Sequence, residues 1–352
     1  MGRSAAGFAV RLGFAAARVR VVLAVVRFFV VVLVLRLVVL RRRRPGIVSP
    51  SSPGTVSGDT DGTSDGIAVM TEDVGEDQRL ASRTVGDGGP DVVFVHGLFG
   101  QGKNWTTIAR GLADDHRVTL LDLPNHGHSP WTDRVDYLDM AEMVATEIEH
   151  LGRPVTLVGH SMGGKVAMQL ALRRAELLRA LVVVDVAPVV YPVRGGRTDD
   201  PDEEASPFAE YIAAMRALDL DALRTRDEAD EALRPAVPSR MVRSFLLQSL
   251  VREGTGPDGG WRWRLNLEAL ERDLGDLRGF PDPPPGASFD GPVLWIAGAT
   301  STYVLPEDRP HMDALFPATR LVRIKNAGHW VHSEQPETFL ATLRRFLASV
   351  EE

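Results

Sequence analysis

Short apolar runs recur along the chain between about residue 80 and residue 350, and segments with helical periodicity separate them. The runs occupy residues 92–95, 117–121, 155–158, 181–184, 292–297 and 321–324. Continuous apolar runs of this length are typical of strands that are buried on both faces of a parallel sheet. Helical spacing covers residues 137–151, 164–178 and 336–350. The pattern predicts an α/β fold with a doubly wound, mostly parallel sheet flanked by helices.

A long insert, residues 191–290, interrupts this alternation. Its helical pieces lie at 207–220, 220–233 and 239–251. An insert between two core strands has to pack over the strand ends, where a cap excludes water and shapes a pocket. We expect a helical cap after the strand at 181–184, counted as the sixth core strand, and a core formed by residues 79–190 and 291–352. Aromatic side chains are expected to line the pocket: Phe99, Phe245, Trp261, Trp263 and Trp330.

Residues 1–44 contain 10 arginines and no acidic residue, and residues 21–40 are apolar except for Arg27 and Arg36. The apolar stretch has the length of a membrane span, although arginines near the bilayer centre are unfavourable. Two interpretations follow: either this segment contacts a membrane, or it precedes the true start, for which Met70 is the candidate. We expect a cytoplasmic protein, or a membrane-associated one if residues 1–44 are retained. Residues 45–78 are typical of a disordered linker.

Composition excludes several classes of function. The chain contains no cysteine, which excludes a disulfide scaffold, a thiolate zinc site and a cysteine nucleophile. Residues 45–352 carry 30 basic and 47 acidic groups, a net charge of −17, because only 10 of the 40 basic residues precede them. An acidic body of this kind argues against nucleic-acid binding.

The pentapeptide Gly159-His160-Ser161-Met162-Gly163 follows one of the apolar runs and precedes a predicted helix. A strand, a G-x-S-x-G motif and a helix in that order are the context of a nucleophile elbow. The glycines allow a turn so tight that the serine side chain projects from the sheet. We therefore predict that Ser161 is a nucleophile.

A serine hydroxyl needs a base, and His329 is the best candidate because it lies in the loop after the last apolar run. The histidine needs an orienting carboxylate in turn. The commonest position for that acid, after the preceding strand, holds Ser301 instead. Asp185 ends the strand that follows the elbow helix, and it is a stronger candidate than Glu307 or Asp308.

The oxyanion that forms on acyl attack needs two N–H donors. Met162 directly follows the predicted nucleophile and is expected to supply one of them. The loop after the strand at 92–95 is expected to supply the other, from Leu98, with Phe99 as the next candidate.

Five motifs carry a resemblance to a known family. They are His96-Gly97-Leu98-Phe99-Gly100, residues 122–130, residues 159–165, Val184-Asp185-Val186-Ala187-Pro188 and residues 327–332. Over about residues 78–350 the chain resembles α/β-hydrolases, and more narrowly the YbfF-type esterases and their abhydrolase-domain relatives. The resemblance implies hydrolysis of short to medium acyl esters or thioesters, acyl-CoA included, without a cofactor or metal. It also implies the triad acid at Asp185 and a serine at Ser301.

Other functions stay open at this point. Residues 97–104 nearly match a phosphate-binding loop of nucleotide-binding proteins, although Asn104 replaces the hydroxyl that would bind the metal. His126 and His128 have the spacing of metal ligands, but no third ligand accompanies them. A C–C bond hydrolase and a cofactor-free perhydrolase or haloperoxidase would use the same serine, histidine and N–H donors. The sequence favours a Ser161–His329–Asp185 hydrolase that acts on a small-molecule acyl ester or thioester through an acyl-enzyme.

Overall fold

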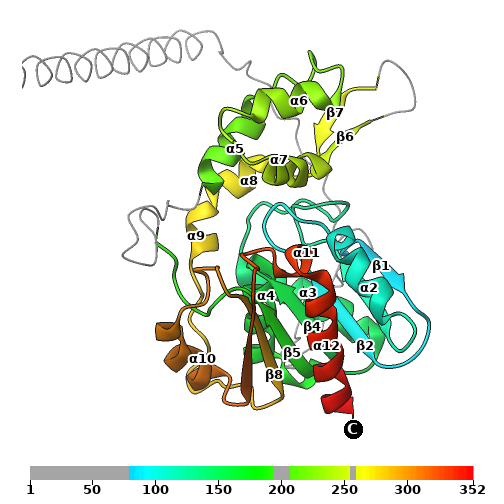
Figure 1. Cartoon of the computed structure of the whole chain (residues 1–352), viewed down its shortest axis with the longest axis vertical. Coiled ribbons are helices and arrows are strands. Elements are labelled where there is room, and N and C mark those ends of the chain that lie inside the picture. Colours follow the sequence, from blue (N-terminus) through cyan, green and yellow to red (C-terminus); the bar gives the residue numbers. More distant parts are fainter. Residues whose placement is uncertain (1–78, 193–206, 254–258, 352) are drawn as a thin grey trace, which may run out of the picture. The chain divides into compact units, whose positions relative to one another are not determined.

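The sheet at the centre of the described structure contains seven strands, with helices on both of its faces (Figure 1). The structure is a computed structural model that describes residues 79–192, 207–253 and 259–351; the predicted membrane segment and linker lie outside the described residues. All described residues belong to one compact unit, Thr71–Glu352. The predicted α/β class with a mostly parallel sheet is confirmed.

The strands of this sheet are β1 Ser82–Val85, β2 Asp91–Val95, β3 Arg117–Leu121, β4 Val155–His160, β5 Leu178–Val184, β8 Val293–Gly298 and β9 Thr319–Ile324. Their order in the sheet is β1-β3-β2-β4-β5-β8-β9. Only β1 runs antiparallel to its neighbour. Every residue of β2, β4 and β8 is buried, which explains why these strands give continuous apolar runs in the sequence.

Strand β1 gives no apolar run because it lies at the edge of the sheet, where Ser82, Arg83 and Thr84 are exposed. It pairs with β3 from Ser82 opposite Leu121 to Val85 opposite Val118. The cap follows β5, the fifth strand of the described chain, so our count of six preceding strands was wrong. Within the described residues, β1 is the outermost strand at this edge of the sheet, so five strands and not six precede the cap.

The order of the strands creates a crevice at their carboxyl ends. From β2 the chain crosses to β3 on one side, and later to β4 on the other side. The loops that follow β2 and β4 therefore diverge, and such a switch point is where open α/β sheets bind ligands. Val95 pairs with Gly159, so the loop beginning at His96 lies beside the elbow.

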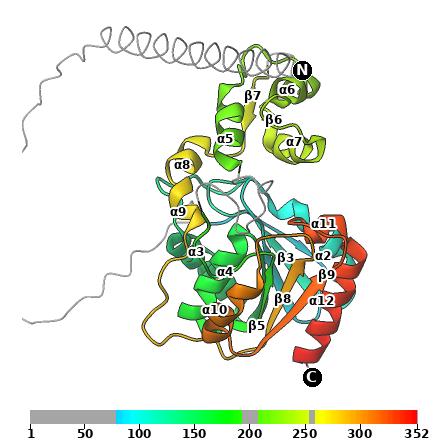
Figure 2. The ribbon, with the colours of Figure 1, turned by 60° about the vertical axis from the view of Figure 1, so that its left-hand side comes forward.

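Helices α3 (Tyr137–Leu151), α4 (Met162–Arg173) and α10 (Arg309–Leu315) cover one face of the sheet, and α2 (Thr106–Leu112) and α12 (Pro336–Glu351) cover the other (Figure 2). Helix α3 has the predicted bounds because both of its ends are capped. The Asp136 carboxylate accepts hydrogen bonds from two N–H groups of the first turn, and Gly152 is left-handed with φ 73°. Helix α4 begins two residues earlier than predicted, directly after Ser161.

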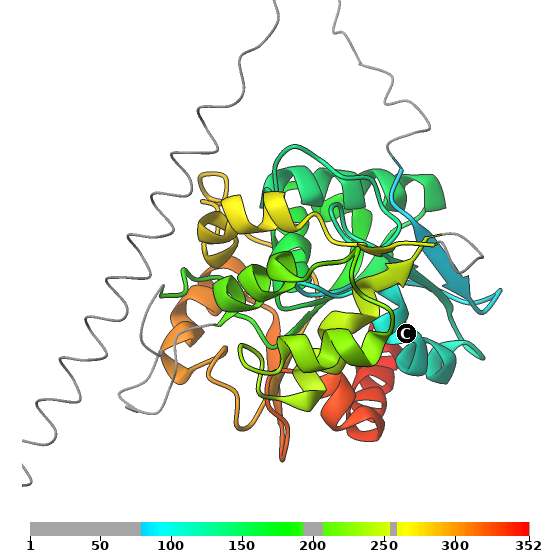
Figure 3. The same cartoon turned by 90° about the horizontal axis from the view of Figure 1, so that it is seen from above.

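The insert forms helices α5 Phe208–Ala217, α6 Arg226–Leu233, α7 Arg240–Leu246, α8 Leu267–Arg272 and α9 Leu274–Arg278, with a two-stranded ribbon of β6 Leu250–Arg252 and β7 Trp261–Trp263 (green to yellow in Figure 3). Helix α5 packs on α8, and α6 packs on α7. The buried side chains of the insert belong to the same hydrophobic cluster as those of α3 and α4. Short 3₁₀ helices lie at Gly102–Trp105, Ala175–Leu177, Leu247–Ser249 and Pro306–Asp308. The predicted domain boundaries stay a prediction.

Within residues 79–192, 207–253 and 259–351, no helix combines the length and the apolar character needed to cross a bilayer.

Candidate active site

Ser161 lies in the turn between β4 and α4, with φ 52° and ψ −120°. A positive φ is unfavourable for a residue with a Cβ, so the surrounding structure has to hold it there. The Ser161 N–H donates to the Val184 carbonyl oxygen at 3.0 Å, which fixes the turn to β5. A Cβ at Gly159 would lie 2.3 Å from the Gly163 carbonyl oxygen, and one at Gly163 would lie 2.4 Å from that of His96. Both glycines of the motif are therefore required by close backbone approach.

The three side chains predicted to form a triad meet at the carboxyl ends of the strands. His329 Nε2 lies 3.0 Å from Ser161 Oγ, and His329 Nδ1 lies 2.8 Å from Asp185 Oδ2. Ser161 follows β4, Asp185 follows β5, and His329 lies between β9 and α11 (Val331–Glu334). With Nδ1–H donating to the carboxylate, Nε2 is the acceptor for the serine hydroxyl. The arrangement can lower the barrier to attack by the serine oxygen.

The Asp185 carboxylate is fully buried and accepts three hydrogen bonds. Besides His329, it accepts from the Gly298 N–H at 2.8 Å and from the Ser301 hydroxyl. Ser301 thus occupies the position where an orienting acid is commonest, and its hydroxyl donates to the Asp185 carboxylate. Glu307 is exposed, and Asp308 Oδ2 accepts from the Leu305 N–H at 2.8 Å. Of the predicted acid candidates, the structure brings Asp185 to His329.

Sequence reasoning missed Tyr303, whose ring stacks on the His329 imidazole with centroids 4.0 Å apart and planes inclined by 24°. The Tyr303 carbonyl oxygen accepts from the Tyr191 hydroxyl at 2.7 Å, and that hydroxyl accepts from the Ala187 N–H at 2.8 Å. The loop that carries Tyr303 is therefore fixed to the segment after Asp185. No pattern in the sequence marks Tyr303 as a neighbour of His329.

The N–H groups expected to bind an oxyanion lie beside Ser161. Met162 is the first residue of α4, where a helix has N–H groups without intrahelical acceptors. On the neighbouring loop, the Phe99 N–H donates to His126 Nε2 at 3.2 Å. The Phe99 N–H is thus engaged, which favours Leu98 over Phe99 as the second donor.

Two neutral histidines brace the loops around the elbow. His126 accepts from Phe99 at Nε2, so its Nδ1 carries the proton and donates to the Pro124 carbonyl oxygen at 2.8 Å. His96 accepts from the Leu123 N–H at Nε2, 2.9 Å away, and its Nδ1 donates to its neighbour's carbonyl oxygen. Burial lowers the pKa of both imidazoles, and that of His126 to about 3. These loops therefore depend on uncharged histidines.

A second pair of histidines, His160 and His332, packs beside His329. The His160 ring lies 4.7 Å from the His329 ring and 4.9 Å from the His332 ring, centroid to centroid. His160 Nε2 donates to the His329 carbonyl oxygen at 2.9 Å. His332 stacks on Trp105 at 4.1 Å. Burial, and then the nearby His329, hold the pKa of His160 well below its usual range.

Acidification is expected to destabilise the fold below about pH 6.5, the usual pKa of an unfolded-chain imidazole. Below that pH the unfolded chain binds a proton that folded His126 does not bind until about pH 3, so the free energy of unfolding falls as the pH falls. Each such histidine contributes a loss of up to about 1.4 kcal/mol per pH unit. Urea unfolding midpoints between pH 7.5 and pH 4.5 measure the slope. His126→Gln should reduce this slope by the amount that corresponds to about one proton taken up on unfolding. An unchanged slope would contradict the assignment of His126 as a neutral histidine in the folded protein.

Two cavities adjoin Ser161, and Leu98 and Phe208 belong to the walls of both. The first cavity is also bordered by His329. Of the predicted pocket residues, three line this first cavity: Phe99, Phe245 and Trp330. The second cavity extends along the start of α4, where Met162 and Lys165 border it.

Trp261 and Trp263 border neither cavity, which corrects our prediction for them. Both lie in β7 of the cap ribbon. The Trp263 indole N–H donates to the Met215 carbonyl oxygen at 3.1 Å, inside the cap. The guanidinium of Arg252 lies over the Trp261 ring at 5.1 Å. These indoles stabilise the cap itself, and periodicity alone does not distinguish that role from pocket lining.

The loop after β2 does not form a phosphate cradle. The Gly100 N–H donates to the Gly97 carbonyl oxygen at 2.9 Å, and the Gly102 N–H donates to Asp122 Oδ1 at 2.6 Å. Lys103 donates to the Gln248 carbonyl oxygen at 3.2 Å. The groups that would bind phosphate thus bond within the protein, which removes the basis of the nucleotide-binding alternative. Among the described residues, no group of three or more His, Asp or Glu side chains is placed to hold a metal ion.

Comparison with known proteins agrees with the observed fold. Residues 90–336 match the family described as alpha/beta hydrolase fold. The chain is 38% identical over 266 residues to the sn-1-specific diacylglycerol lipase ABHD11 of Mus musculus, which covers 74% of this chain and 81% of that protein. It is 36% identical over 257 residues to the esterase YbfF of Escherichia coli K12, which covers 73% and 92%. Among solved structures, it is similar to a marine microorganism esterase, with a TM-score of 0.70, 32% identity, and coverage of 76% and 99%.

Proposed function

Because this chain belongs to the alpha/beta hydrolase fold family and is a carboxylic ester hydrolase of small-molecule substrates, we propose that it works through an acyl-enzyme on Ser161. The observation that carries the proposal is the hydrogen-bond chain from Ser161 Oγ through both His329 nitrogens to the buried Asp185. In this proposal Ser161 is the nucleophile, His329 the base and Asp185 the orienting acid.

Acylation begins when Ser161 Oγ attacks the ester carbonyl carbon and His329 Nε2 takes the hydroxyl proton. Asp185 stabilises the imidazolium that results, and its bond to Nδ1–H keeps the ring in the reactive tautomer. The C–O bond of the tetrahedral intermediate then breaks, and His329 returns the proton to the departing alcohol. Water attacks the acyl-enzyme by the same sequence in deacylation, which releases the acid and restores Ser161.

The negative charge of each tetrahedral intermediate rests on the former carbonyl oxygen. We assign its stabilisation to the N–H groups of Leu98 and Met162. The N-terminal end of α4 adds a favourable dipole at this point. The His126 bond to Phe99 supports the assignment, because it holds the neighbouring loop residue in a left-handed conformation with φ 63°.

For the substrate, we propose esters and thioesters of short to medium acyl chains, acyl-CoA included. The aromatic and aliphatic side chains around Ser161 support an apolar acyl group. The mouse relative is named for diacylglycerol, so a diacylglycerol belongs in the same substrate panel.

Labelling with a fluorophosphonate probe tests the proposal, because the probe reacts covalently with an activated serine. We expect one label per chain, at Ser161 by peptide mapping, together with turnover of p-nitrophenyl and acyl-CoA esters of graded length. A folded protein that neither labels at Ser161 nor hydrolyses any ester of the panel would sink the proposal.

The cellular location of the protein depends on whether residues 1–44 belong to the mature chain. We propose a cytoplasmic enzyme, with membrane association as the alternative if residues 1–44 are part of the mature protein; that segment lies outside the described residues. Amino-terminal sequencing of the natively expressed protein separates the two, since a start near Met70 excludes the membrane contact.

A further inference from the structure

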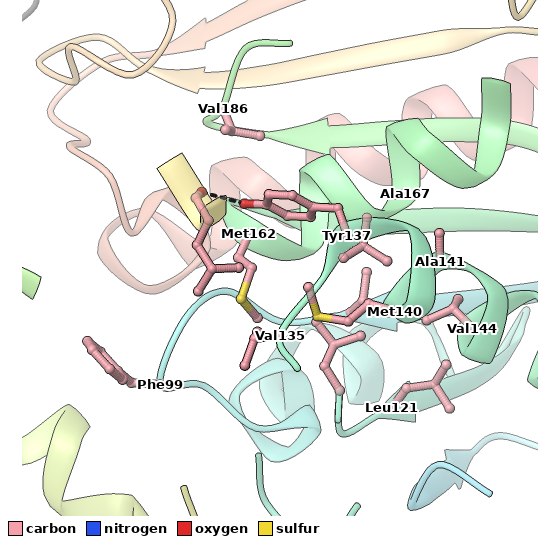
Figure 4. Packing of buried hydrophobic residues seen from close by; sticks show 14 of the residues in the cluster. Phe99, Leu121, Val135, Tyr137, Met140, Ala141, Val144, Met162, Ala167 and Val186 are labelled. Atoms are coloured by element: carbon pink, nitrogen blue, oxygen red, sulfur yellow. Dashed lines mark hydrogen bonds between the residues drawn. The ribbon is translucent and has the colours of Figure 1, made fainter. Parts of the chain in front are cut away.

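The second cavity beside Ser161 has two basic residues in its wall. Lys165 lies one helical turn after Ser161 in α4, and Arg278 is the last residue of α9. Figure 4 shows three other wall residues, Tyr137, Met162 and Val186, gathered at this end of the sheet. Within the described residues, no Asp or Glu borders the cavity. Its wall is therefore apolar with a positive electrostatic character.

Arg278 contributes a buried donor without an acceptor. Its Nε atom is shielded from solvent and has no hydrogen-bond partner, and its guanidinium forms no ion pair within the described part of the chain. Two other arginines of the cap are paired, Arg243 with Asp230 and Arg272 with Asp273. A buried donor without a partner is unfavourable, and a guanidinium fork at a cavity wall matches the geometry of a carboxylate.

The neighbouring polar groups hold the wall together. Lys165 Nζ donates to the carbonyl oxygens of Arg278, at 2.9 Å, and Gly279, and it lies 4.6 Å from the centre of the Tyr191 ring. The Tyr137 hydroxyl donates to the Leu277 carbonyl oxygen at 2.7 Å, the dashed line in Figure 4. These bonds fix the backbone on which Arg278 is carried.

The chemistry of acylation indicates which part of the ester enters this cavity. The departing alcohol has to receive its proton from His329 Nε2. His329 borders the first cavity and does not border the second. The alcohol part therefore lies in the first cavity, and the acyl part extends into the second, toward Lys165 and Arg278.

We propose that the second cavity binds an acyl chain that carries a carboxylate, and that Arg278 binds this carboxylate. The preferred substrates are then monoesters of dicarboxylic acids rather than esters of neutral acids. This inference rests on the proposed function, because it assumes the acyl-enzyme on Ser161.

The test compares p-nitrophenyl hexanoate with the mono-p-nitrophenyl ester of adipic acid, which has the same acyl length and a terminal carboxylate. We expect wild-type kcat/KM to be at least about 10-fold higher for the adipate ester. Arg278→Met should lower kcat/KM for the adipate ester about 10- to 100-fold and leave that for hexanoate within about threefold. Arg278→Lys should retain part of the preference, because it keeps the charge without the fork.

Controls separate the possible failures. Arg234→Met removes an exposed cap arginine that borders neither cavity and pairs with Glu231, so it should leave both rates unchanged. The inference would be overturned if Arg278→Met lowered kcat/KM equally for both esters, or if the wild type showed no preference for the adipate ester. Hydrolysis of the hexanoate ester would in either case still support the proposed function. A loss of kcat/KM in Arg278→Met that is confined to 4-carboxyphenyl hexanoate would also overturn the inference. The carboxylate of that ester lies on its alcohol part, so Arg278 would then bind the alcohol side and not the acyl side. Hydrolysis of neither ester by the wild type would contradict the proposed function itself.

Discussion

Replacing Ser161 with alanine is expected to lower kcat for a p-nitrophenyl ester about 10⁶-fold, because the acyl-enzyme can no longer form. The Leu98 and Met162 N–H groups and the two cavities stay in place, so a small rate above the uncatalysed reaction should persist. The measurement is single-turnover kinetics at high enzyme concentration, with fluorophosphonate labelling of the same sample. Labelling should be lost completely.

Ser333 offers a matched control for this variant. It is exposed in α11, four residues after His329, and Ser333→Ala should keep the wild-type kcat and labelling. If Ser161→Ala retained more than about one hundredth of the wild-type kcat while folded, direct attack by water would replace the covalent mechanism, contrary to the proposal.

Replacing Asp185 with asparagine is expected to lower kcat about 10⁴-fold, with KM little changed. The Gly298 N–H needs an acceptor, so the amide oxygen of the asparagine should remain on that side and its NH₂ should face His329. His329 Nδ1 would then have to accept, which moves the ring proton to Nε2. An imidazole protonated at Nε2 is unable to take the proton of Ser161. Steady-state kinetics checks the loss.

The two other acids provide the contrast. Glu307→Gln should leave kcat unchanged because its side chain is exposed. Asp308→Asn weakens the cap on the Leu305 N–H, so it should lower the melting temperature more than kcat. Near-normal kcat for Asp185→Asn, or a 10⁴-fold loss for Glu307→Gln, would refute the assignment of the acid.

Much of this site could be predicted from the sequence because of how parallel sheets are built. Strands buried on both faces read as apolar runs, and polar residues that end such runs meet at one edge. Ser161 and Asp185 each follow a run of this kind, and His329 lies in the loop after the edge strand β9, so their proximity followed from topology. The glycines of the elbow gave the backbone conformation of Ser161 as well.

Other features had no signal in the sequence. Tyr303 and Arg278 owe their roles to loops and a short helix whose packing depends on distant segments. An arginine at the end of a helix is usually a solvated residue, and nothing in the sequence distinguishes one that borders a cavity. The same ambiguity placed Trp261 and Trp263 wrongly, because an aromatic residue packs as well inside a cap as against a substrate. Strand β1 was missed because edge strands carry polar residues.

That polar edge strand has a consequence for the association state of the protein. Strand β3, which β1 covers, is buried from Val118 to Leu121. Without β1 it would present an unpaired apolar edge, which is a template for strand addition by a second chain. A chain shortened to begin after Val85 would keep every residue of the active site and would still be prone to aggregate. Strand β1 therefore prevents β3 from pairing edge to edge with a second copy of this chain.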